Sequence, residues 1–145
     1  MLDASKGIAL FTDGSCYYLD GSGGWAFIAI DSDSNEEVRS GAARDTTNNR
    51  MEIQAWIEGL TYLQMTFGPC EVLVYCDSQY VGLGAMDRKR ARRKNRDLWK
   101  RLDEAMDSHK YVEFVWVRGH HESYYNQLAD KLAGQARKGM GSEAR

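Results

Sequence analysis

The chain has 145 residues, of which 43% are hydrophobic and 28% are charged, and its formal net charge is −2. This balance is typical of one globular domain with a substantial core, and it excludes a disordered chain. No apolar run approaches the ~20 residues that a membrane helix requires, and the first residues lack the features of a secretory signal. The three cysteines contain no CxxC pair, which fits a reducing compartment and argues against a zinc site. We therefore expect a cytoplasmic protein without membrane contact.

The first predicted element is a strand over residues 7–15, which ends abruptly in Asp13-Gly14-Ser15. Its continuous apolar residues are typical of a strand that is buried on both faces. A carboxylate at the end of such a strand is costly to bury without a partner, so Asp13 is a candidate functional residue. Gly14 would let the backbone come close to whatever lies over that carboxylate.

Two further strands follow over residues 25–31 and 36–42, joined by a hairpin turn. The cluster of Thr and Asn at residues 46–49 favours the start of a helix, and apolar residues at helical spacing extend this helix to residue 67. The next predicted strand, over residues 71–76, is short, apolar and followed by Asp77, as expected for a central parallel strand.

The remaining pattern predicts four elements: helices over residues 78–86, 95–108 and 123–138, and a strand over residues 111–117. The expected fold is α/β, with a five-stranded mixed sheet of three antiparallel and then two parallel strands, flanked by helices. Residues 1–138 are expected to form a single domain, and residues 139–145 a flexible tail.

The strand directions bring four carboxylates to one edge of this sheet. Asp13 and Asp77 follow two strands that run the same way, Glu52 lies in the first turn of the helix after the third strand, and Asp130 lies about two turns into the last helix. Open α/β sheets bind ligands at this edge. For Glu52 taken alone, a place in solvent or at a helix cap remains the alternative.

Four acids at one place raise the pKa of one another unless a cation compensates them. Mg²⁺ accepts carboxylate and phosphate oxygens, and two such ions ~3.5–4 Å apart can clamp both oxygens of a phosphoryl displacement. A basic run at residues 88–96 also stands out in this acidic chain. It is either a solvated helix face or a segment that contacts phosphates.

Five motifs in chain order resemble those of type 1 ribonuclease H. They are FTDGSC at 11–16, TTNNRME at 46–52, DSQYV at 77–81, WVRGH at 116–120 and the stretch at 126–133. The resemblance implies a ribonuclease H-like fold and an endonuclease that hydrolyses the RNA strand of RNA–DNA hybrids. It also implies two Mg²⁺ ions, for which Mn²⁺ could substitute, and products with 5′-phosphate and 3′-hydroxyl ends. The partner would be the hybrid, and the protein a monomer.

The same resemblance assigns roles to individual residues. The metal ligands would be Asp13, Glu52, Asp77 and Asp130, and His120 would join them in catalysis. The groups near the minor groove of the hybrid would be Gly14, Ser15, Cys16, Thr47, Asn48, Asn49 and Gln79. The candidate phosphate contacts from the basic run are Arg88, Arg92, Arg93 and Lys94. For Asn48 and Asn49, plain helix capping remains the alternative.

Two positions depart from the family pattern. Leu19 stands where members usually carry an Asn that reaches the 2′-hydroxyl, and Arg88 stands where longer members place a Trp against the DNA strand. The segment Tyr17-Tyr18-Leu19 either faces the substrate or packs inward. Two other functions therefore stay open: a broader nuclease that also cuts double-stranded RNA, and a non-catalytic module that binds hybrids. Four intact acids argue against the module.

Overall fold

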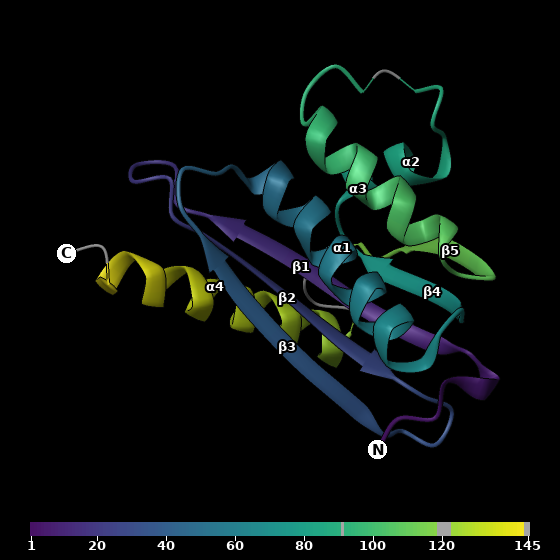
Figure 1. The fold of residues 1–145 in the computed structure, drawn as a ribbon. Coiled ribbons are helices and arrows are strands. Elements are labelled where there is room, and N and C mark those ends of the chain that lie inside the picture. The colour runs from purple at the N-terminus through teal and green to yellow at the C-terminus, as the bar shows by residue number, and fades with distance from the viewer. Residues whose placement is uncertain (91, 119–122, 144–145) are drawn as a thin grey trace.

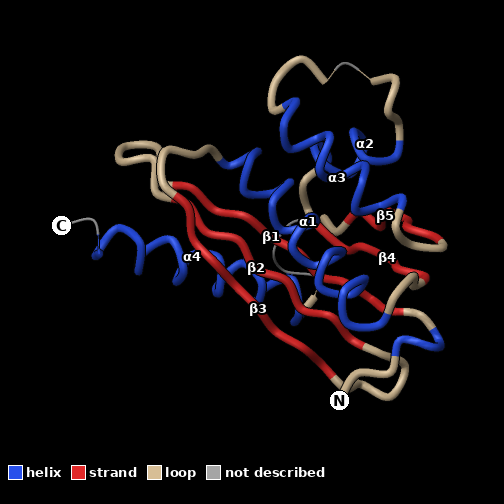
Figure 2. Tube along the Cα trace, viewed as in Figure 1, coloured by secondary structure: helices blue, strands red, loops and turns tan. Residues whose placement is uncertain are grey.

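The computed structural model describes residues 1–90, 92–118 and 123–143. Its centre is a five-stranded sheet of order β3-β2-β1-β4-β5 (Figures 1 and 2). The strands are β1 (Ile8–Cys16), β2 (Gly23–Ile30), β3 (Glu36–Ala43), β4 (Glu71–Cys76) and β5 (Tyr111–Trp116). The first three strands are antiparallel, β4 runs parallel to β1, and β5 runs parallel to β4. The predicted class and strand directions are confirmed.

Helices cover both faces of this sheet. They are a short 3₁₀ helix (Ala4–Lys6), α1 (Asn48–Phe67), α2 (Gln79–Met86), α3 (Arg96–Asp107) and α4 (Tyr124–Glu143). Figure 1 shows α1 in front of the sheet and α4 behind it, with α2 and α3 beside α1. Within the described ranges, no helix is both long and apolar enough to cross a membrane.

The main core lies between the sheet and α1, where Leu10, Trp56 and Val74 are fully buried. On the opposite face, α4 packs on β1, β2 and β3. Strand β4 therefore alternates: Val72 and Val74 are buried, whereas Leu73 between them is 38% exposed. The predicted central position of β4 is confirmed, but its continuous apolar run is not buried throughout.

The predicted end of the last helix at residue 138 is wrong, because α4 continues to Glu143. A glycine ends a helix readily when it adopts a left-handed conformation, as Gly68 does after α1 with a φ of 79°. Gly139 has no positive φ and stays helical. Its cost within a helix is only about 1 kcal/mol, which does not stop the helix.

His109 joins three segments at the end of the sheet that lies away from Asp13 and Asp77. Its Nδ1 accepts a hydrogen bond from the backbone N–H of Cys70 at 3.0 Å, and its Nε2 lies 2.8 Å from the carbonyl oxygen of Leu60. Since Nδ1 faces a donor, the proton of the neutral ring lies on Nε2 and is donated to Leu60. Burial lowers the pKa of His109 below its ordinary value of 6.5.

We expect His109 to make the protein less stable in mild acid. In the unfolded chain, His109 binds a proton below about pH 6.5, whereas in the folded chain it stays neutral down to its lower pKa. The free energy of unfolding therefore decreases as pH is lowered across this window. Urea unfolding of the wild type and His109→Gln, from about pH 7.5 to about pH 5.5, measures this. The wild type should lose more stability than the variant over this range, because all other groups titrate in both proteins. Equal losses would contradict the assignment.

Candidate active site

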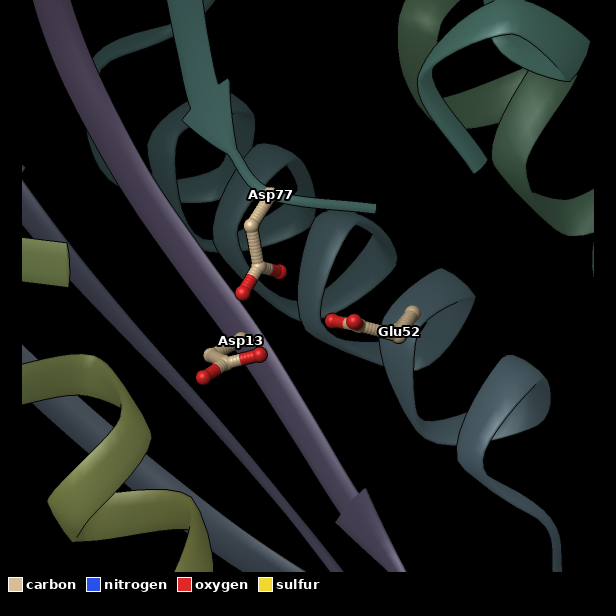
Figure 3. Close-up of side chains that lie close together, drawn as sticks. All are labelled: Asp13, Glu52 and Asp77. Carbon is tan, nitrogen blue, oxygen red and sulfur yellow. The ribbon is translucent and has the colours of Figure 1, made fainter. Parts of the chain in front are cut away.

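Three carboxylates converge at the edge of the sheet where β4 ends (Figure 3). Asp13 extends from β1, Asp77 follows β4 directly, and Glu52 projects from α1. One oxygen atom from each carboxylate lies within 4.8 Å of the others. The structure therefore shows the predicted convergence of these three acids.

The site forms where β1 extends beyond its pairing with β4. Pairing of β1 with β4 ends at Phe11 and Tyr75, whereas β1 continues beside β2 as far as Cys16. Asp13 thus lies beyond the last pair of β1 with β4, next to the turn that carries Asp77. A fourth acid, Asp130 of α4, is near enough to Asp13 for its charge to raise the pKa of Asp13, although the Asp130 residue as a whole is exposed.

Glu52 reaches the site because α1 lies directly against β1. A Cβ atom at Gly14 would overlap the backbone of Met51 and Glu52. The backbone N–H of Gly14 also donates to Oδ1 of Asp13 at 2.9 Å. The glycine that follows Asp13 therefore permits the contact that brings a helix carboxylate onto a strand carboxylate.

The cluster carries more negative charge than its surroundings compensate. Burial, followed by the charges of Asp77 and Asp130, raises the pKa of Asp13 to about 8. Burial and the charges of Asp13 and Asp77 raise the pKa of Glu52 well above its ordinary value. Without a cation, the folded protein therefore keeps protons on this cluster at neutral pH.

The donor set fits a hard divalent cation. All the converging atoms are carboxylate oxygens, which Mg²⁺ and similar ions prefer. Oε1 of Glu52 is buried and has no hydrogen-bond partner among the residues that the structure describes. A buried oxygen without a donor is costly, and a bound cation would satisfy it.

The family of the chain follows from comparison with known proteins. The RNase H family model matches residues 5–138. The chain belongs to the RNase H family. A ribonuclease H of Pseudomonas fluorescens is 41% identical over 147 residues, covering 93% of each chain. A ribonuclease H of Nitratidesulfovibrio vulgaris is 43% identical over 143 residues, covering 88% of this chain and 87% of that protein. The chain is accordingly a nuclease, a hydrolase of an RNase H type.

Solved structures of RNase H domains share its fold. The N-terminal RNase H domain of a Mycobacterium tuberculosis protein has a TM-score of 0.80 at 22% identity, covering 95% of this chain and 98% of that one. A compost-derived RNase H1, solved in complex with an RNA/DNA hybrid, has a TM-score of 0.75 at 24% identity and covers 92% of this chain and 98% of that one.

In this RNase H fold, the predicted minor-groove residues lie around the acidic cluster. Ser15 and Cys16 end β1, and the Cys16 thiol donates to the carbonyl oxygen of Thr46 at 3.3 Å. Asn48 and Asn49 begin α1 and are exposed, and Gln79 begins α2 and is exposed. The capping alternative for the two asparagines is wrong, because the Thr47 hydroxyl caps α1 by accepting from the Arg50 N–H at 3.2 Å.

The loop that contains Leu19, the first departure from the family pattern, faces outward. Tyr18 is 84% exposed and Leu19 is 66% exposed, so the inward-packing alternative is wrong for both. Tyr17 is the more covered of the three residues, because the Arg137 guanidinium lies over its ring at 5.5 Å. His120, the predicted catalytic histidine, lies outside the described residues.

The basic run divides into two groups. Arg92 is bound within the protein: its guanidinium donates to both carboxylate oxygens of Asp103, at 2.7 and 3.0 Å, and to the Gly84 carbonyl oxygen. Arg88 likewise pairs with Asp107 at 2.6 Å. Arg93 and Lys94 are exposed. Arg88 is exposed as well, but it is paired, so Arg93 and Lys94 are the exposed cations without an ion pair to a described residue among the four predicted phosphate contacts.

We expect Arg93 and Lys94 to affect the binding of the hybrid, and Arg92 to affect the stability of the protein. The double variant Arg93→Gln/Lys94→Gln should flatten the salt dependence of hybrid binding by about 0.7–0.9 log units per lost phosphate contact. Arg92→Gln should instead lower the free energy of unfolding by roughly 1–3 kcal/mol, because the Gly84 carbonyl loses its donor and Asp103 keeps only the longer contact with Arg88 at 3.4 Å. Binding titrations at several salt concentrations and urea unfolding provide the two readouts. An Arg92→Gln variant that binds weakly but unfolds normally would contradict the division.

A group of hydrogen-bonded side chains around Arg50 was not identified from the sequence. Arg50 donates to Asn95 and Asp97, and Asn95 donates to the hydroxyl of Tyr80. The only sequence signal for it is the place of Arg50 inside the TTNNRME motif. The partners lie 45 and 47 residues away along the chain, where spacing predicts nothing.

Proposed function

We propose that the chain is an endonuclease that hydrolyses the RNA strand of RNA–DNA hybrids with the help of two Mg²⁺ ions, leaving 5′-phosphate and 3′-hydroxyl ends. The observation that carries the proposal is the cluster of Asp13, Glu52 and Asp77, with the charge of Asp130 acting on Asp13. Support for the substrate comes from the compost-derived RNase H1 of the same fold, whose structure contains an RNA/DNA hybrid. We further propose that the protein acts as a cytoplasmic monomer, with Mn²⁺ as a possible substitute ion.

The four carboxylates would hold the metal ions. When bound, two such ions supply an activated water and compensate the charge that develops on the attacking and leaving oxygens. Asp13, Glu52 and Asp77 would hold the ions through their carboxylate oxygens, and Asp130 would add a fourth carboxylate beside Asp13 that helps to position the attacking water. The raised pKa of Asp13 means that loading the site releases protons, so metal binding should tighten with rising pH.

The residues around the cluster would select the substrate. The amides of Asn48, Asn49 and Gln79 are exposed, and each can both donate and accept. The 2′-hydroxyl also donates and accepts, and it is the group that distinguishes RNA from DNA. Backbone groups at Gly14, Ser15 and Cys16 and the cap at Thr47 would complete the contacts. We include His120 in the catalytic set on the resemblance alone.

One experiment tests the proposal against its alternatives. The protein is incubated with end-labelled RNA–DNA, RNA–RNA and DNA–DNA duplexes, with Mg²⁺, with Mn²⁺ and with EDTA, and the product ends are identified by mass spectrometry. We expect cleavage of the RNA strand of the hybrid only, and only with metal. Binding of the hybrid without cleavage would identify a binding module instead.

The exposed Leu19 favours one second candidate, a nuclease that also cuts double-stranded RNA. A leucine cannot hydrogen-bond to a 2′-hydroxyl, so one contact that selects the RNA strand is missing from this loop. The net contribution of such a bond is about 0.5–1.5 kcal/mol, which is small beside the remaining contacts. Cleavage of RNA–RNA at a rate comparable to the hybrid would establish this broader activity.

A further inference from the structure

A network of polar side chains joins the first turns of three helices. The Arg50 guanidinium, on α1, donates to Oδ1 of Asp97 at 3.0 Å and to Oδ2 at 2.7 Å, on α3. It also donates to Oδ1 of Asn95 at 3.3 Å. The Asn95 side chain then donates to the hydroxyl of Tyr80, on α2, at 2.9 Å. We call Arg50, Tyr80, Asn95 and Asp97 the Arg50 network.

Three members of the Arg50 network are next to candidate substrate residues. Arg50 directly follows Asn48 and Asn49, Tyr80 follows Gln79, and Asn95 follows Lys94. These residues come from three segments that are distant in sequence and share no strand. The network therefore links the parts of the surface that would meet the two strands of one duplex.

The geometry of Asn95 indicates that the network does more than cap a helix. An Asn in this position usually accepts a hydrogen bond from the first turn of its own helix. Asn95 makes no such bond: its backbone is left-handed, with a φ of 62°, and its side chain spans from Arg50 to Tyr80 instead. The Asp97 side chain is 63% exposed, and ion pairs as exposed as this one contribute little to stability.

We propose that Arg50 is a positioning residue. It fixes the end of the basic run and the start of α2 in place relative to Asn48 and Asn49. This role rests on the proposed function, since it concerns how the hybrid is bound. A surface that is ordered before binding avoids the entropy cost of ordering it in the complex. The planar guanidinium bonds to Asp97 and Asn95 at once, which the single ammonium of a lysine does not reproduce.

A double-mutant cycle tests the proposal. The variants Arg50→Met, Asp97→Asn and their combination are compared by binding of a labelled RNA–DNA hybrid in EDTA, and by kcat and KM with Mg²⁺. We expect each single change to weaken binding and raise KM about fivefold, with kcat within about twofold of the wild type. The double variant should be no worse than either single one, because both break the same bridge. Arg50→Lys should not restore binding.

Arg39→Met is the matched control. It removes the same charge and also breaks an exposed ion pair, with Glu37 at 3.1 Å, but on the edge strand β3. Binding and KM should stay at wild-type values. A loss equal to that of Arg50→Met would mean that overall charge, and not position, determines binding.

Two results would overturn the proposal. If Arg50 contacted the nucleic acid itself, Asp97→Asn would free it and binding would stay the same or tighten. If backbone hydrogen exchange at residues 92–97 were the same in Arg50→Met and the wild type, the bridge would not order this segment. A wild type that binds no hybrid would refute the proposed function and, with it, the positioning role. The exchange measurement would still show whether the bonds from Arg50 to Asp97 order residues 92–97.

Discussion

Asp13→Asn should abolish cleavage, with a fall in kcat of at least about a hundredfold, and should leave the protein folded. Asp13 is only 4% exposed, and one of its oxygen atoms lies within 4.8 Å of an oxygen atom of both Glu52 and Asp77. A neutral amide would remove one negative charge and one ligand from the cation site. The measurement is hydrolysis of a labelled RNA–DNA hybrid at saturating Mg²⁺.

The same variant should be at least as stable as the wild type when metal is removed. The folded pKa of Asp13 is about 8 and its ordinary value is 3.8, so the unfolded chain holds fewer protons than the folded chain between these values. Stability of the metal-free wild type therefore falls as pH rises through this window, and Asn removes that loss. Thermal unfolding in EDTA at about pH 8 should show an equal or higher Tm for the variant.

Asp33→Asn provides the control for this prediction. It makes the same chemical change at an exposed position in the turn between β2 and β3, away from the cluster. Its activity and its pH dependence should match those of the wild type. Retention of more than a few per cent of wild-type activity by Asp13→Asn would remove this residue from the centre of the mechanism.

Gly14→Ala should both destabilise the protein and inactivate it. The new methyl group would overlap the backbone of Met51 and Glu52, and a helix backbone cannot move aside as a flexible side chain can. Forcing a methyl group into such a contact costs about 2–3 kcal/mol, which lowers the Tm of a chain of this size by roughly 5–10 °C. The shift of α1 would also carry Glu52 away from Asp13, so activity should fall even at temperatures where the variant is folded.

Gly134→Ala is the matched control, because a Cβ at this position in α4 meets no atom of the described residues within 4 Å. Since alanine favours the helix by about 1 kcal/mol over glycine, this variant should be as stable as the wild type or more stable. Circular dichroism gives the folded fraction, and activity is compared at equal folded fraction. A Gly14→Ala protein with normal Tm and normal activity would show that α1 does not lie against β1 as described.

Local rules predicted the strands and the acids that follow them. The apolar runs before Asp13 and Asp77 indicated buried strands, and the crossover rule made those strands parallel. Both acids were therefore predicted at one edge, and the structure places them there. Glu52 was harder to predict, because its position depends on how closely α1 approaches Gly14.

Features that depend on distant packing could not be predicted in this way. Leu73 is exposed because α4 covers β1 to β3, which the pattern of β4 itself does not contain. Arg92 was predicted to contact phosphate, yet it bonds to Asp103 on a different element. Which charged side chains pair with each other depends on tertiary distances, so a run of like charges does not reveal which of its members are accessible.

The order of the acidic residues along the chain has a consequence for folding. Parallel pairing of β1 with β4 brings Ile8 beside Val72, and Asp130 joins only when α4 docks. Contacts between such distant residues form slowly, because a long loop must close before they stabilise anything. During synthesis, the four proposed metal ligands can therefore come together only after the last helix has been made. Under the proposed function, we expect a nascent chain that ends before α4 to hydrolyse no hybrid, because it lacks Asp130.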